Sequence, residues 1–113
     1  MVTIETFRQM ALSLPDSFEL PHFEKTSFRI NLPDRQAGKK IFATLAEEKS
    51  IAMLTLSLID QSVFCSFDKA VIYPVAGAWG TKGYTYINLK KIKKPMLKDA
   101  LACAYKNIIA KKK

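Results

Sequence analysis

The residues of this chain best placed to do chemistry are four lysines just before a predicted helix: Lys90, Lys91, Lys93 and Lys94. Pro95, which follows them, favours the first turn of a helix. Positive side chains beside the free amide groups of a helix start suit the binding of a phosphate. Lys82 precedes the run in a loop, and Tyr84 and Tyr86 lie on the strand between, where exposed rings would stack on bases. The pattern predicts a candidate site for DNA or another polyanion.

For this segment taken alone, a second interpretation of the same lysines is favoured, a solvated turn that keeps the protein soluble. Lysine without arginine also argues against the reading of a base sequence. The net charge of +8 is uneven, however: residues 82–113 hold ten lysines and one acid, Asp99, whereas residues 1–81 carry a net charge of −1. A domain that was merely soluble would not need this asymmetry. The last three lysines, residues 111–113, are expected to form a solvated tail.

The single histidine, His22, alternates with Glu24 onto one face of a predicted strand, where the two could act as an acid–base pair. No nucleophile, second acid or oxyanion-forming glycine turn stands near them in the sequence. Glycine-rich phosphate loops, HExxH, GxSxG and paired catalytic carboxylates are also absent. A structural or surface histidine is therefore favoured, and the sequence predicts a protein that is not an enzyme.

Two further side chains each have a functional and a structural interpretation. Trp79 lies between Gly77 and Gly80, where it could be a lid or a recognition aromatic, although capping an exposed edge of the core is the favoured role. Arg29 could bind an anion, but an ion pair across the sheet with an acid such as Glu19 or Glu24 is the simpler expectation.

The cysteine and histidine content argues against a metal site or another bound cofactor. Cys65 and Cys103 are far apart, and one histidine with two distant thiols cannot form the usual four-ligand zinc site. Reduced, buried thiols are expected, as is usual in the cytoplasm. No signal peptide is recognisable and the longest apolar stretch is too short to span a bilayer, so we expect a cytoplasmic protein without a membrane partner.

The elements that must position these residues fit one domain over residues 1–113. Thr3 can cap a first helix over residues 4–13, which ends at Pro15. Strand patterns follow over residues 18–23, 27–31, 40–46 and 50–56, and Pro21 marks the first of them as an edge strand. Short connections between these strands predict an antiparallel meander.

The second half of the chain adds helices and a further strand. Ser57 and Asp60 begin a helix that would end near Phe67, with a predicted buried face of Ile59, Val63, Phe64 and Phe67. Residues 71–74 form a short strand or extended piece, and residues 77–83 form a flexible loop. Residues 84–89 alternate as a fifth strand, and an apolar stripe predicts the last helix: Leu97, Ala100, Leu101, Ala104, Tyr105 and Ile108. The fold class is α+β, with an antiparallel sheet of about five strands in the order α-β-β-β-β-α-β-α.

An ordered set of short motifs covers nearly the whole chain. They are Phe7 with Arg8, residues 11–15 (ALSLP), 22–25 (HFEK), 27–29 (SFR), 40–45 (KIFATL), 56–57 (LS), 60–61 (DQ), 83–85 (GYT) and 87–89 (INL), and Ala104 with Tyr105. Together they resemble the MmcQ/YjbR-like family of small bacterial proteins. One departure is Tyr84, where tryptophan is expected in that family, while Trp79 lies a little earlier.

The resemblance implies a CyaY-like, or double wing, fold, in which N-terminal, middle and C-terminal helices pack on the antiparallel sheet. It brings no catalytic residues, and the role suggested for the family is DNA binding. The sequence therefore leads to a first hypothesis, a non-enzymatic domain that contacts nucleic acid through phosphates by a C-terminal basic face. The alternative is a module that binds a protein partner or a small ligand, with residues 77–83 and the exposed sheet as the contact surface.

Overall fold

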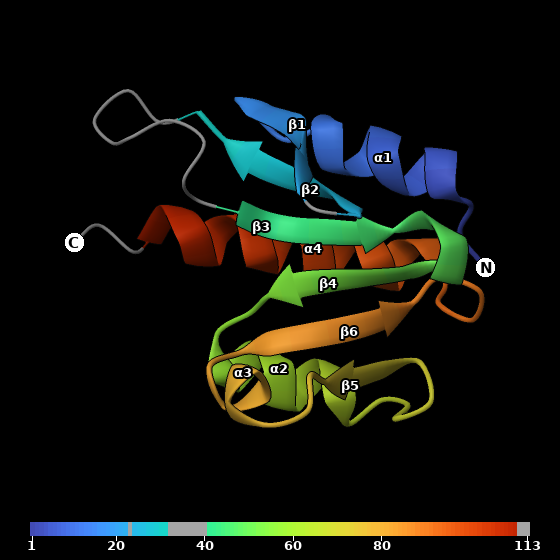
Figure 1. Cartoon of the computed structure of the whole chain (residues 1–113). Helices are drawn as coiled ribbons and strands as arrows, with labels where there is room; N and C mark the ends of the chain where they lie inside the picture. The colour runs from blue at the N-terminus through green and yellow to red at the C-terminus, as the bar shows by residue number, and fades with distance from the viewer. Residues whose placement is uncertain (23, 32–40, 111–113) are drawn as a thin grey trace.

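The computed structural model describes residues 1–22, 24–31 and 41–110 and forms an α+β fold (Figure 1). The polar stretch over residues 31–38 is typical of a turn between two strands, but all of it except Asn31 lies outside the described residues, as does the C-terminal lysine tail. The elements, in chain order, are α1 (Ile4–Leu12), β1 (Ser17–His22), β2 (Lys25–Ile30), β3 (Ile41–Ala46), the 3-10 turn η1 (Glu47–Lys49), β4 (Ile51–Thr55), α2 (Leu58–Cys65), β5 (Ile72–Pro74), α3 (Ala78–Thr81), β6 (Tyr84–Asn88) and α4 (Lys94–Ala110). The predicted fold class and order of main elements are confirmed.

All six strands pair antiparallel in the order β1-β2-β3-β4-β6-β5. The first four strands form the predicted meander, and β6 then inserts between β4 and β5. The stretch over residues 71–74 contributes a true edge strand, β5, which brings the sheet to six strands. β1 forms the other edge, as its proline predicted, because Pro21 has no N–H to donate to a second neighbour.

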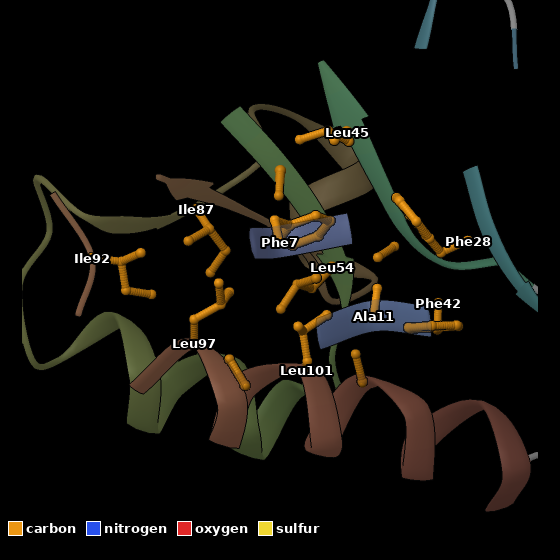
Figure 2. Packing of buried hydrophobic residues seen from close by; sticks show 14 of the residues in the cluster. Phe7, Ala11, Phe28, Phe42, Leu45, Leu54, Ile87, Ile92, Leu97 and Leu101 are labelled. Atoms are coloured by element: carbon orange, nitrogen blue, oxygen red, sulfur yellow. The ribbon is translucent and has the colours of Figure 1, made fainter. Parts of the chain in front are cut away.

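The long helices α1, α2 and α4 pack on one face of the sheet, which we call the covered face. Phe7 of α1 meets Phe28 of β2 edge to face, with ring centroids 5.5 Å apart. Tyr105 of α4 meets Phe42 of β3 in the same way, at 5.8 Å. Figure 2 shows Leu97 and Leu101 of α4 pointing toward the sheet, where the core lies. Antiparallel strands bury alternate residues on such a face.

The other face of the sheet is not covered by α1, α2 or α4, and we call it the open face. One register row crosses all six strands on it: Leu20, Ser27, Thr44, Met53, Tyr86 and Tyr73. In β6 the alternation is complete, because Thr85 and Ile87 are fully buried on the covered face whereas Tyr84, Tyr86 and Asn88 remain half-buried. The parity of β6 therefore places both predicted site tyrosines on the open face.

The predicted buried face of α2 is wrong, although its start at Ser57 is confirmed by a hydrogen bond from the Asp60 amide. Phe64 is 8% exposed, but Ile59, Val63 and Phe67 are 78%, 51% and 63% exposed. The reason is a polar residue on the inner side of the helix. The Gln61 side-chain amide donates to Gly80 O, to Tyr84 O and to Thr85 Oγ1, and this turns the predicted apolar stripe outward.

The segment predicted as a flexible loop, residues 77–83, contains the short helix α3 and is tightly fixed. A Cβ atom at Gly80 would collide with the backbone carbonyl of Val75, and one at Gly83 would collide with that of Leu56. Gly83 also has a φ of 103°, which side chains disfavour. These two glycines seat α3 against the end of the sheet and hold Trp79 beside β6.

Candidate nucleic-acid interface

The four clustered lysines lie on the turn between β6 and α4, which we call the lysine turn (residues 89–94). Leu89 and Ile92 are buried in the core, so the lysines that flank them in pairs are exposed. Asn88 shapes the turn: its Oδ1 accepts from the Lys90 amide at 3.1 Å, and its carbonyl accepts from the amides of Lys91 and Ile92. Two buried anchors and three hydrogen bonds thus fix the backbone that presents the lysines.

Carboxylates near this end of the sheet are held by a different cation. The amide of Leu89 donates to Ser50 O at 2.9 Å, which places η1 beside the lysine turn. Yet Glu47 of η1 pairs with Arg8 at 3.0 Å, and Arg8 also pairs with Glu5 and Glu19, each at 3.2 Å. The ion pairs that described residues form with one another all involve Arg8. Among the residues that the structure describes, no carboxylate pairs with Lys90, Lys91, Lys93 or Lys94 at contact distance.

Lys82 and Tyr84 lie at the opposite end of β6 from the lysine turn. The ammonium of Lys82 lies 5.4 Å from the centroid of the Trp79 ring, a cation–π contact. The Trp79 and Tyr84 rings meet edge to face with centroids 5.2 Å apart. Trp79 is 58% exposed. The interpretation favoured from the sequence, in which Trp79 caps an exposed edge of the core, is therefore wrong.

Tyr86 lies between these two groups, in the middle of β6 on the open face. Its cross-strand partner is Tyr73 of β5, and their ring centroids are 5.7 Å apart. Tyr73 was not singled out from the sequence, because its place beside Tyr86 depends on the pairing of a three-residue strand whose register no local pattern reveals. The Tyr73–Tyr86 contact could be predicted only once the pairing of β5 with β6 was known.

The structure thus arranges the predicted site residues along one strand and does not gather them into a single cluster. The lysine turn and Lys82 are separated by β6, which spans about 17 Å. Lys98 and Lys106 are exposed along α4, on the covered side of the sheet. The C-terminal positive charge is therefore divided between one clustered turn, one lysine at the far end of β6 and scattered helix positions.

The other candidate residues form no reactive constellation among the described residues. The side chain of His22 lies outside them, and Glu24 is exposed. Arg29 donates from Nε to Ser27 Oγ at 2.9 Å on the open face, while Glu19, one of its proposed partners, lies on the covered face with Arg8. A shallow hollow of about 410 Å³ is lined by Asp16, Ser17, Phe18 and Asn31.

Both thiols are free and half-buried, which agrees with reduced cysteines. Burial raises the pKa of Cys65. It also raises the pKa of Cys103, with smaller contributions from neighbouring charges. Both are thus held as thiols and are poor nucleophiles at neutral pH. No group of three or more histidine, cysteine or acidic residues in the described part of the chain is arranged so that it could hold a metal ion. No helix there is long and apolar enough to cross a membrane.

Comparison with known proteins adds a fold relationship. No family model matches the sequence, and no curated protein matches it. The fold is similar to that of the crystal structure of Deinococcus radiodurans protein DR2400, whose domain is assigned to the family DUF419. The TM-score is 0.81 at 17% sequence identity, over 98% of this chain and 81% of that chain. This similarity shows a shared α+β architecture.

Proposed function

We propose that this protein is a non-enzymatic, cytoplasmic member of the MmcQ/YjbR-like family that binds nucleic acid, mainly through phosphates, at its lysine turn. The DUF419 assignment of DR2400 supports the family, because DUF419 is the MmcQ/YjbR-like family. The two free thiols support the location.

The single observation that carries the proposal is the geometry of the lysine turn. Four lysines are exposed on a backbone fixed by Leu89, Ile92 and Asn88, while Glu47 of the neighbouring η1 is engaged by Arg8. A cluster of unpaired ammonium groups releases condensed counterions when it contacts phosphates, and this release provides most of the affinity of non-specific binding. Lysines contribute point charges and do not read bases in pairs of hydrogen bonds, so the expected binding is weakly selective for sequence.

A salt titration of nucleic-acid binding, measured by fluorescence anisotropy, tests the proposal. The logarithm of the binding constant should fall linearly with the logarithm of salt concentration, with a slope of about 0.7 to 0.9 per phosphate contact. Replacement of Lys90, Lys91, Lys93 and Lys94 by Gln should flatten that slope by up to about three. The matched control removes the same charge elsewhere, by Gln at four exposed lysines: Lys25, Lys69, Lys98 and Lys106. Equal slopes for the two quadruple variants would contradict the lysine turn as the site.

The alternative function, a module for a protein partner, is favoured by one observation. Ile59 and Val63 of α2 are exposed, as are Leu58 beside them and Phe67, which follows the end of the helix. Apolar groups that gather on one surface often mark a contact with another protein. Absence of any salt-dependent nucleic-acid binding by the wild-type protein would favour this alternative.

A further inference from the structure

We infer that the nucleic acid bound by this protein is single-stranded and lies along β6 on the open face, with its bases stacked on a line of aromatic rings. This inference rests on the proposed function and names the class of nucleic acid. The line, which we call the β6 track, begins at Lys82 and Trp79, continues through Tyr84 and Tyr86, with Tyr73 beside Tyr86, and ends at the lysine turn.

The β6 track offers the two kinds of contact that bind a single strand, aromatic rings for the bases and positive charge for the phosphates. Aromatic rings lie in the middle of the track, and positive charge lies at both ends, at Lys82 and at Lys90 and Lys91. Base–aromatic stacking accepts any base, while ammonium groups hold the phosphates on either side. The same order of residues on a buried strand would have no access to a ligand, but the parity of β6 places Tyr84 and Tyr86 on the open face.

Spacing along the strand distinguishes a single strand from a duplex. Tyr84 and Tyr86 are two residues apart on one side of β6, which corresponds to about 7 Å. Bases stacked in a duplex are about 3.4 Å apart along each strand, and their faces are already covered by their neighbours. Successive bases can therefore stack on successive rings of the β6 track only if they are unstacked from one another, as flexible single strands allow.

The aromatic pairs are also preorganised. Trp79 and Tyr84 contact each other at 5.2 Å, and Tyr73 and Tyr86 at 5.7 Å, so each ring is supported by a partner before any ligand arrives. Gly80 and Gly83 fix the short helix that carries Trp79. Rings held in place lose little side-chain entropy on binding, which favours affinity.

The experiment compares fluorescein-labelled 12-nucleotide dT and U strands with a 12-base-pair duplex, by anisotropy, on the full chain. Both single strands should bind at least tenfold more tightly than the duplex. Tyr86→Leu keeps the charge but removes the ring, and should weaken single-strand binding by roughly 5- to 150-fold with an unchanged salt slope. Tyr86→Phe should retain binding within about twofold. Phe67→Leu is the matched control, because it removes another exposed ring, just after α2 and outside the β6 track.

The single tryptophan provides an independent measurement on unlabelled protein. Trp79 lies on the β6 track, so its fluorescence should be quenched by unlabelled dT strands and much less by the duplex. Equal affinities for the single strands and the duplex, together with a wild-type affinity of the Tyr86→Leu variant, would overturn this inference. That outcome would leave the proposed phosphate binding at the lysine turn intact. Absence of binding to all three probes would overturn both proposals.

Discussion

The two faces of the sheet are made by the same six strands but carry opposite kinds of residue. On the covered face, β6 contributes Thr85 and Ile87, which are fully buried under the helices. On the open face, the same strand contributes Tyr84 and Tyr86, which are half-buried and pair with other aromatic rings. Because alternate residues of a strand point to opposite faces, the residues of β6 that stabilise the core and those proposed to bind a ligand alternate along a single strand.

The largest expected effect separates the two faces by stability. Phe28→Ala removes a fully buried ring that contacts Phe7, and should lower the free energy of unfolding by about 3 to 5 kcal/mol. Tyr86→Leu on the open face should lower it by about 1 kcal/mol or less, because only a cross-strand aromatic contact is lost. Urea unfolding followed by circular dichroism measures both. Similar losses for the two variants would mean that the open face is also part of the core.

A second comparison lies within α2, where neighbouring residues differ sharply in burial. Phe64→Ala should cost about 3 kcal/mol, because this ring packs under the helix at 8% exposure. Val63→Ser, one position away but 51% exposed, should change the free energy of unfolding by less than about 1 kcal/mol. The same urea unfolding measurement applies. A loss near 3 kcal/mol for Val63→Ser would restore the buried face predicted from the sequence.

The smallest expected effect concerns alkaline pH and the contact between α4 and the end of α1. The Tyr105 hydroxyl donates to Pro15 O at 2.5 Å. Burial, with the charge of Asp16 as a smaller cause, raises the pKa of Tyr105 above its ordinary 10.0. The folded protein therefore holds this proton more tightly than the unfolded chain does. The contribution of the protonated hydroxyl to the free energy of unfolding is fully present below pH 10.0. It is lost as the pH rises through the pKa of Tyr105 in the folded protein.

Tyr105→Phe tests this by thermal melts between pH 7 and 11. The variant should be less stable by at most about 1 kcal/mol at pH 7, because one hydrogen bond is lost. Its stability should fall less steeply above pH 10 than that of wild type. Any fall in stability with pH that remains in the Tyr105→Phe variant is assigned to the thiols of Cys65 and Cys103, whose pKa values burial also raises. Parallel curves for the two proteins would show that ionisation of Tyr105 is not linked to folding.

Sequence patterns predicted the fold well where local signals were strong. The apolar stripe of α4, the cap of α1 at Thr3 and the edge position of β1 all follow from spacing or from single residues, and the structure has them. The exposed side of α2 could not be foreseen, because its orientation is set by hydrogen bonds from Gln61 to residues 19 to 24 positions away. Long-range polar contacts of this kind leave no periodic trace.

The arrangement of the candidate site residues could be predicted from the sequence only in part, whereas their function stays a proposal. The lysines and tyrosines of the C-terminal third stand out by composition, and the alternation of β6 places Tyr84 and Tyr86 together. The contribution of Tyr73 depends on the pairing of β5 with β6, and that of Trp79 depends on the backbone contacts of Gly80 and Gly83. Strand register and close backbone approach are properties of the folded chain, and short sequence motifs do not encode them visibly.

The prolines at the two sheet edges limit the ways in which another chain can join this molecule. Pro21 in β1 and Pro74 in β5 each remove one backbone donor from the outermost strands. A foreign strand added to either side would meet an interrupted ladder, so growth of the sheet by augmentation or fibril-like stacking is disfavoured. The proposed binding mode does not depend on these edges, because it uses the side chains of the broad surface between them.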